Sequence, residues 1–311
     1  MKAPALLPMY LTSSISLLSK RPVPFLPLLS KHPVPFLPLL IKQAFSLFIL
    51  LLLLASCEKP IQSDDEVANP QDGNLIVRVA DNAHSCTRLN FAVYDMSGTR
   101  VKQVNQQSSA ADFGSAVFQL EPGDYQLVIV AHSSNGNPTM ASPKKIQFTN
   151  TQGFTDTFLY DDTITVGDSR KELQVVPRRI VSLCRFAITD NYPADVNLMR
   201  FYYTGGSGAF DATTGLGCVN SRQDVKFDVS SGQKEFDLYT FLHSDEGAIR
   251  LKVTALDVNG AEAYNREYDV SLKQNHITRC TSPYFSGDSM ASATGLFDGF
   301  NGWEGEYYLN F

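Results

Sequence analysis

The sequence predicts an all-β protein built of two tandem β-sandwich domains. Short segments alternate apolar and polar residues, turn signals separate them at short spacing, and no long stretch carries the apolar stripe of an amphipathic helix. The part of the chain with this pattern, residues 74–311, is long enough for two domains of ordinary size. We therefore expect one sandwich over residues 74–168 and a second over residues 175–311.

The first predicted sandwich begins with the alternating segment LIVRV at residues 75–79. A second strand ends in the turn DMSG at 95–98, and a Pro-Gly turn at 122–123 leads into a third. In that third strand, alternate apolar residues form a row over 125–131. Hairpin signals at this spacing are typical of a sandwich or a barrel.

Charges and a proline interrupt the strand pattern over residues 166–179, and we interpret this stretch as the break between the domains. The pattern restarts at 180–188, where alternate apolar residues share one face. The turn at 230–233 separates two further strands. Asn259-Gly260 predicts a hairpin, because both residue types tolerate a positive φ.

An uncharged run from Ala44 to Ser56 ends at Cys57. It is shorter than the roughly 20 apolar residues that a membrane-spanning helix needs, but it has the length of the apolar region of a signal peptide, with Lys42 before it. Leu54-Ala55-Ser56-Cys57 has the order of a bacterial lipobox, at which a peptidase cuts the chain and the cysteine thiol is acylated. Two or more acyl chains hold a protein stably at a membrane. The alternative is a cleaved soluble signal peptide with a chance cysteine.

We expect residues 1–56 to be a leader and lipoprotein signal peptide that is removed, and residues 57–73 to be a flexible, acidic tether. The leader carries a tandem copy, RPVPFLPLLSK and HPVPFLPLLIK, which we interpret as translated upstream sequence. SDDE at 63–66 resembles the acidic surface-export signal of some lipoproteins and equally suits a solvated linker.

Net charge argues against a nucleic-acid partner. Five of the 26 basic residues and none of the 32 acidic residues lie in the leader, so the mature chain has 21 basic residues and a formal charge of −11. A chain this acidic has no basic surface on which to neutralise phosphates.

Six segments of the chain resemble one family of surface proteins. The segments are VAHSSNGNP, FTDTFLYDDTITVG, RRIVSLCRFAITD, FYYTGGSGAFDATTGLGCVNSRQ, FDLYTFLHSDEG and NGWEGEYYLNF. Together they are similar to the fimbrillin-associated anchor family, the lipoprotein minor subunits of type V pili, and the resemblance extends over about residues 75–311.

This resemblance implies two transthyretin-like Greek-key sandwiches attached by lipid to the outer membrane, with the protein exposed at the cell surface. It also implies that the protein attaches a fimbrium and limits its length. The expected partners are the major fimbrial subunit, accessory fimbrial proteins and, through the acyl chains, the outer membrane.

The last residues of the chain form an alternating segment, EGEYYLNF, in which Tyr307, Leu309 and Phe311 share one face. An extended segment with alternating anchors can complete the sheet of another subunit. We therefore regard these three residues as a candidate donor strand or subunit contact. The alternative is an ordinary final strand of the second sandwich.

No catalytic or metal constellation stands out, and we expect no enzyme activity, cofactor or metal. The glycine-rich block 204–218 lacks the Gly-Lys-Ser/Thr of a phosphate loop and predicts a structured loop between strands. His243-Ser244-Asp245 are neighbours in sequence, and neighbours on a strand point apart. His84 and Cys86 lack a second ligand cluster. Asp161-Asp162 predicts a solvated acidic turn, with weak cation binding as the alternative.

The remaining cysteines lie in the predicted sandwiches. Cys184 shares a face with apolar residues, and we expect it to be buried and reduced. Cys218 and Cys280 are a candidate disulfide, although four thiols including Cys86 allow three full pairings.

A second function class stays open, namely a surface lipoprotein that binds glycan or protein ligands through its sandwich loops. Glycan-binding surfaces usually display aromatic rings, and the chain has one tryptophan, Trp303. Tyr202-Tyr203 and Tyr307-Tyr308 are the other candidates for such a surface.

Overall fold

The computed structural model describes residues 73–80, 85–149, 153–287, 292–298 and 302–311. Every regular element in this part of the chain is a strand, and the 21 strands form five sheets. The all-β prediction is confirmed. No helix among these residues is long and apolar enough to cross a bilayer. Cys57 and the predicted leader lie outside the described residues.

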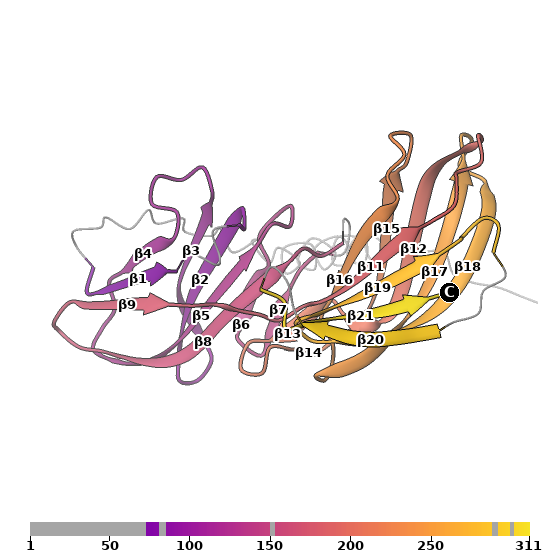
Figure 1. Ribbon diagram of the computed structural model, residues 1–311. Coiled ribbons are helices and arrows are strands. Elements are labelled where there is room, and N and C mark those ends of the chain that lie inside the picture. Colours follow the sequence, from indigo (N-terminus) through magenta and orange to yellow (C-terminus); the bar gives the residue numbers. More distant parts are fainter. Residues whose placement is uncertain (1–72, 81–84, 150–152, 288–291, 299–301) are drawn as a thin grey trace, which may run out of the picture. The chain divides into compact units, whose positions relative to one another are not determined.

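Two sheets are built from the first half of the chain, which we define as residues 73–179 (Figure 1). Sheet 1 has the order β4 (Ser115–Phe118), β1 (Leu75–Val79), β9 (Lys171–Val175). Sheet 2 has the order β10 (Arg178–Arg179), β8 (Thr157–Val166), β5 (Gly123–His132), β2 (Arg88–Asp95), β3 (Arg100–Gln107). Their apolar side chains form one core, which includes Leu75, Val77, Leu89, Phe91, Leu127 and Ile129.

Two further sheets are built from the second half, residues 180–311 (Figure 1). Sheet 3 has the order β16 (Glu235–Thr240), β11 (Ser182–Ile188), β19 (His276–Ser282), β21 (Gly305–Asn310), β20 (Ser292–Asp298). Sheet 4 has the order β15 (Asn220–Asp228), β12 (Val196–Ser207), β17 (Glu246–Asp257), β18 (Glu262–Lys273). A second core, rich in aromatic rings, includes Phe186, Phe201, Tyr203, Phe236, Tyr268 and Tyr284.

The fifth sheet takes strands from both halves, and we call it the shared sheet. Its order is β14 (Leu216–Gly217), β13 (Ala209–Asp211), β7 (Lys145–Gln147), β6 (Thr139–Ser142). A third apolar cluster likewise combines Tyr94, Val128 and Phe148 of the first half with Phe210 and Phe241 of the second. The two halves are therefore joined by backbone pairing and by a buried core.

Strand β5 shows why that third cluster matters. Leu127 and Ile129 point into the first core, whereas Val128 and Val130 belong to the third cluster, and all four are fully buried. The alternation in its sequence predicts an apolar row on one face. The strand is in fact covered on both faces, because the second half supplies apolar side chains to the cluster on its other side.

The stretch 166–179, expected to be a break between domains, forms part of the first half instead. β9 pairs in parallel with β1, with Leu75 opposite Lys171, and β10 pairs with β8, with Arg178 opposite Leu159. β9 is a short outer strand of sheet 1 with exposed polar residues at alternate positions, Glu172 and Gln174, so its sequence lacks the apolar run of a central strand. The strands of the first half therefore extend to residue 179, beyond the predicted end at 168.

Two of the predicted turns, at 95–98 and at Asn259-Gly260, share one chemistry. In the β2–β3 turn the Asp95 carboxylate accepts from the backbone N–H groups of Ser97 and Thr99, both at 2.9 Å. In the β17–β18 turn Asp257 accepts in the same way from Asn259 and Ala261, both at 2.8 Å. These hydrogen bonds lower the pKa of both carboxyls, led by the side chain of Ser97 at Asp95 and by the backbone of Ala261 at Asp257.

Only the glycine of each turn takes a left-handed conformation, with φ of 85° at Gly98 and 80° at Gly260. The hairpin predicted at Asn259-Gly260 is thus confirmed, but Asn259 does not need the positive φ that it tolerates. Both turns lie next to a register shift in the adjoining strand pair, which is typical of a bulged hairpin loop.

Candidate functional site: the C-terminal strand and the junction of the halves

Strand β21 lies inside its own sheet. It pairs in parallel with β19, with Tyr307 opposite Thr278, and antiparallel with β20 on its other side. The three residues predicted as a candidate donor strand do share one face, and that face points into the core of the second half. Leu309 and Phe311 pack against the core cluster, and Tyr307 stacks on His276 with ring centroids 5.6 Å apart.

None of these three side chains is fully buried. Phe311 contacts the ring of Tyr268 at 4.8 Å between centroids, and its backbone N–H donates to the carbonyl of Thr281 at 2.9 Å. The structure shows β21 as an inner strand of the chain's own sheet, between β19 and β20. Its donation to another subunit stays a prediction.

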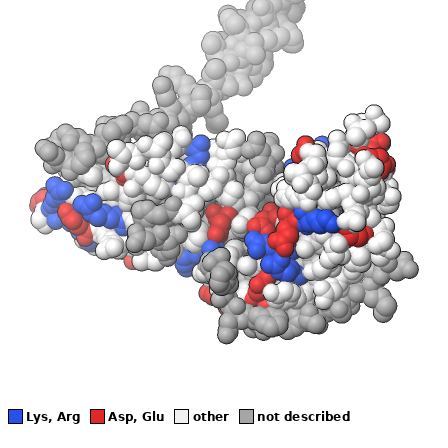
Figure 2. Space-filling view, turned by 45° about the horizontal axis from the view of Figure 1, so that its top comes forward, with Lys and Arg blue, Asp and Glu red and all other residues white. Residues whose placement is uncertain are grey.

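The outer face of sheet 3 holds a network of ion pairs across the strands. Arg279 of β19 donates to Glu306 of β21 at 2.9 Å and to Glu235 of β16 at 2.8 Å. Arg185 of β11 forms a two-pronged pair with Asp237 at 2.6 and 2.8 Å, and this hydrogen bonding raises the pKa of the guanidinium. Figure 2 shows that basic and acidic side chains intermix on the face in view rather than forming a patch of one sign.

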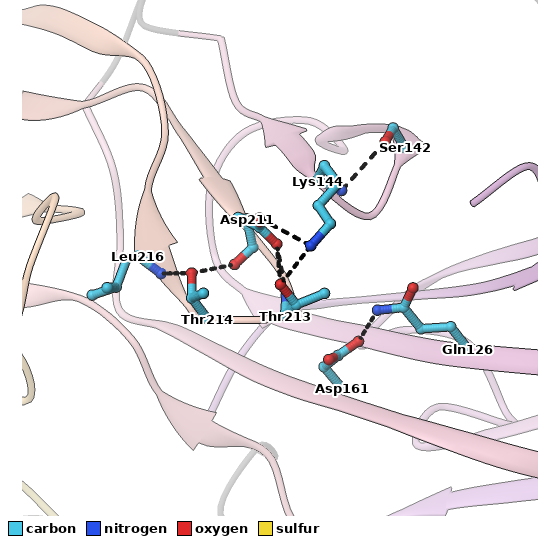
Figure 3. A network of polar contacts seen from close by, with 8 residues as sticks. All are labelled: Gln126, Ser142, Lys144, Asp161, Asp211, Thr213, Thr214 and Leu216. Carbon is cyan, nitrogen blue, oxygen red and sulfur yellow. Dashed lines mark hydrogen bonds and ion pairs between the residues drawn. The ribbon is translucent and has the colours of Figure 1, made fainter. Parts of the chain in front are cut away.

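The shared sheet is fixed by polar contacts at its edge (Figure 3). Lys144, in the turn between β6 and β7, lies 3.5 Å from the Asp211 carboxylate and donates to the Thr213 hydroxyl at 3.0 Å. Asp211 also accepts from the backbone N–H of Thr213 at 2.9 Å. Phe210 sits opposite Ile146 in the strand pairing between β13 and β7. The glycine-rich block 204–218, predicted as a loop, therefore contains the end of β12 and the strands β13 and β14.

Asp161 and Asp162 lie within β8 and not in the acidic turn predicted from the sequence. Asp161 accepts a 2.5 Å hydrogen bond from the Gln126 amide of the neighbouring strand (Figure 3). Burial raises the pKa of its carboxyl, and the nearby charge of Asp162 adds to that rise. A carboxylate held in this way serves the strand pairing.

Arg179 forms a second connection between the halves. Its guanidinium, 6% exposed, makes a two-pronged pair with Asp156 at 2.7 and 2.8 Å and donates to the Gly302 carbonyl at 2.6 Å. It also lies 4.0 Å from the ring centroid of Trp303 and 4.8 Å from that of Phe158. A buried guanidinium needs its charge and its donors satisfied, and here both halves supply the partners. Trp303 is thereby held at the junction, immediately before β21.

His132 is buried in a chain of polar side chains across sheet 2. Its Nδ1 accepts from the Ser134 backbone N–H at 3.0 Å, so Nε2 carries the proton and donates to Asn90 at 2.8 Å. Asn90 in turn donates to Asn105 at 2.7 Å. Burial lowers the pKa of the imidazole to about 4. The ring is neutral at physiological pH and has a structural place in the sheet.

The structure holds Cys86, Cys184, Cys218 and Cys280 as free cysteines. Cys184 is fully buried in the second core, as predicted. Cys280 is equally buried and its sulfur lies 3.8 Å from that of Cys184, whereas Cys218 is exposed. The neighbour that the structure gives Cys280 is therefore Cys184, and the candidate pairing of Cys218 with Cys280 is absent from it. The two buried sulfurs are close because the parallel strands β11 and β19 adjoin, a pairing that sequence spacing does not reveal.

The described residues contain no group of three or more His, Cys, Asp or Glu side chains that could hold a metal ion. His84 lies outside the described residues, and Cys86 is buried, with a pKa raised to about 12 by burial. The Nδ1–H of His243 donates to the Gly217 carbonyl at 2.8 Å, a contact that holds the end of sheet 3 to the shared sheet.

No family model matches the sequence, and no curated protein matches it. Among solved structures, the chain is similar to a candidate adhesin from Bacteroides ovatus, with a TM-score of 0.45, 14% identity, and coverage of 63% of this chain and 81% of the other. It is also similar to a fimbrial assembly protein from Parabacteroides distasonis, with a TM-score of 0.37, 13% identity, and coverage of 67% and 89%. For the fimbrial anchor protein Mfa2 from Porphyromonas gingivalis the values are 0.38, 11%, 62% and 80%. Similarity at this level does not assign a function to this chain, so the function has to be argued from the chain's own residues.

Proposed function

We propose that this chain is a lipid-anchored minor fimbrial subunit that attaches a fibre to the outer membrane and limits its length. In this proposal Cys57 carries the acyl chains, residues 57–73 form the tether, and the two halves are the two β-sandwich domains. We put the domain boundary after residue 179 and not at 168, and the pairing of β9 and β10 within the first half supports this choice. The protein acts by attachment and not by catalysis.

The observation that carries the proposal is the order of features at the N-terminal side. A signal-peptide apolar run leads directly into the lipobox Leu54 to Cys57, a polar acidic segment follows, and the paired strands begin at Leu75. A lipid at Cys57 would tie these strands to a membrane through a flexible segment of charged residues.

We propose that the C-terminal strand makes the contact with the next subunit of the fibre. Tyr307, Leu309 and Phe311 lie in one row, and each is only half-buried in the chain's own sandwich. A row of this kind can serve as the anchor set of a strand that completes another sheet, where main-chain hydrogen bonds supply affinity and side-chain pockets supply register.

The membrane part is tested by Cys57→Ala in cells that export the protein. We expect the variant to leave the membrane fraction, and the native protein to begin at an acylated Cys57 by intact mass. Cys218→Ala is the matched control, because it removes an exposed thiol in the folded part and should leave fractionation unchanged. A native protein with no acyl chain, or a Cys57→Ala protein that stays with the membrane, would overturn the anchor.

The fimbrial part is tested separately by deleting the gene and imaging the cell surface. We expect longer fibres, or fibres released into the medium, because nothing then holds or ends them at the membrane. Purification of the native protein from membranes should bring a polymeric β-rich partner with it. Fibres of unchanged length and attachment in the deletion strain would count against this role.

A further inference from the structure

An open groove lies where β12 approaches the start of β15, away from the C-terminal strand. Its volume is about 620 Å³. The described residues that line it are Tyr202, Thr204, Gly205, Gly206, Asn220, Ser221 and Arg222. Neither the anchor nor the strand pairing proposed above uses this surface.

Two glycines shape the groove. The pairing of β12 with β15 shifts register between Tyr203 and Gly206, so the backbone bulges between them. Gly205 has a φ of 98°, and a Cβ there would collide with the carbonyl oxygen of Ala248. A Cβ on Gly206 would collide with the hydroxyl of Thr240. The backbone therefore closes tightly on β17 and β16, and neither Gly205 nor Gly206 puts a side chain into the space outside it.

Four of the side chains around this space carry polar groups that make no hydrogen bonds or ion pairs with other described residues. Within the described part of the chain, no hydrogen bond or ion pair engages the Tyr202 hydroxyl, the Thr204 hydroxyl, the Asn220 amide or the Arg222 guanidinium. Polar groups that converge on a hollow without partners of their own are available to a ligand.

Arg222 differs from the other cations nearby. Arg250 and Lys252 of β17 lie opposite Thr204 and Tyr202 in the register. They are paired with acidic residues, Arg250 with Glu267 at 2.6 Å and Lys252 with Glu262 at 3.6 Å. Arg200 is likewise paired, with Asp224, which lowers the pKa of that carboxyl. Arg222 is the guanidinium in this group that can offer its full fork of donors to a ligand.

We propose that this groove binds a carboxylated glycan. A tyrosine presents an apolar ring and a hydroxyl at low conformational cost, and an amide and a threonine hydroxyl suit the hydroxyls of a sugar. A guanidinium matches a carboxylate with two parallel hydrogen bonds, which selects an acidic sugar over a neutral one. The mature chain has a formal charge of −11, so an unpaired cation here is a local exception that favours an anionic ligand at this place.

The test uses the purified protein with tetragalacturonate as probe and its methyl ester as the matched neutral ligand. Titration calorimetry or ligand-observed NMR should detect binding of tetragalacturonate. The methyl ester should bind at least about tenfold more weakly, because the charge-assisted hydrogen bond to Arg222 is gone. Arg222→Gln should lower the affinity for tetragalacturonate by the same factor and leave the affinity for the ester unchanged. Tyr202→Ala should weaken both ligands, with Tyr202→Phe as a milder variant that keeps the ring.

Lys226→Gln is the control, since Lys226 is a cation on the same strand and the same face, four residues beyond Arg222. It should bind both probes as the parent does, and melting curves should show that every variant is folded. The proposal is overturned if tetragalacturonate does not bind, if the ester binds equally well, or if Arg222→Gln and Lys226→Gln lose the same affinity. Binding that is instead specific for a protein partner would also overturn it. These results do not depend on Cys57 or on fibre length, so this proposal and the fimbrial one can fail separately.

Discussion

Strands β19 and β21 occupy neighbouring places in one sheet, yet they are held differently. Each has a hydrogen-bonded strand on both sides. On the inner face of β19, Thr278, Cys280 and Ser282 are at most 1% exposed. The corresponding inward-facing residues of the C-terminal segment, Tyr307, Leu309 and Phe311, are half-buried.

The difference shows that two strands with equal backbone pairing can have unequal attachment. Burial of apolar area supplies most of the favourable free energy of packing, while the net value of each backbone hydrogen bond is modest. β21 is therefore held chiefly by its edges and by the Arg279–Glu306 pair, whereas β19 is also held by its face. A strand held in this way is the one that we expect to leave the sheet, or to be exchanged, most readily.

The largest effect should come from truncating the buried face of sheet 3. Phe186→Ala in β11 removes a fully buried ring that contacts Phe201 and Tyr268, and it should lower the free energy of unfolding by about 3–5 kcal/mol. Denaturant titration measures this loss. A loss below about 1 kcal/mol would show that the inner face of this sheet is not what holds it.

Acid should lower the free energy of unfolding through the first half, by an amount comparable to that expected for Phe186→Ala. Because this effect arises outside the second half, it provides a reference for the comparison of β19 with β21. Burial holds the pKa of the folded His132 at about 4, below the ordinary histidine value of 6.5, so between these pH values the unfolded chain binds a proton that the folded chain excludes. The stability from this residue is full above pH 6.5 and falls as the pH drops to 4, by at most about 3 kcal/mol. Denaturant titrations across this range should show the fall, and His132→Gln should flatten it.

The β19–β21 contrast should survive this acidification, because His132 lies in sheet 2. A His132→Gln protein with the same slope as the parent would show that another group causes the acid sensitivity.

Leu309→Ala in β21 should cost less than Phe186→Ala. The side chain is half-buried at the edge of the second core, so we expect a loss of about 1–2 kcal/mol in the free energy of unfolding. The same denaturant titration decides. If Leu309→Ala cost as much as Phe186→Ala, β21 would be held by its face after all.

The smallest effect should come from the outer face. Arg279→Gln breaks the pairs with Glu306 and Glu235, and because the arginine side chain is 24% exposed, screening limits the cost to about 1 kcal/mol. The loss should shrink in high salt. A loss that salt does not change would indicate that Arg279 stabilises the sheet through packing of its side chain and not through its charge.

The sequence predicts those parts of the fold that depend on local chemistry. The strand at 75–79 is visible in its alternation, and the β17–β18 hairpin is visible in Asn259-Gly260. The shared face of Tyr307, Leu309 and Phe311 follows from the two-residue period of a strand. These features need only neighbouring residues to be compared.

The features that the sequence does not reveal come from pairings between distant segments. β9 is recognised as a strand only because β1, about 95 residues earlier, lies beside it in parallel. The pairing of β7 with β13, the contact of Cys184 with Cys280 and the burial of both faces of β5 have the same origin. No local pattern encodes the partner in these cases, so the shared sheet and the groove beside Gly205 could not be anticipated.

The most direct test of the central claim is hydrogen exchange of β19 and β21 in the purified protein, followed by mass spectrometry of peptides that cover 276–282 and 305–311. If β21 is the strand held by its edges and available to join a fibre, its amides should exchange at least about tenfold faster than those of β19 under native conditions. The same difference should appear in Cys218→Ala and should grow in Leu309→Ala. Equal protection of the two strands would mean that β21 opens only when the whole sandwich unfolds, and it would contradict the proposal that this strand joins the protein to its fibre.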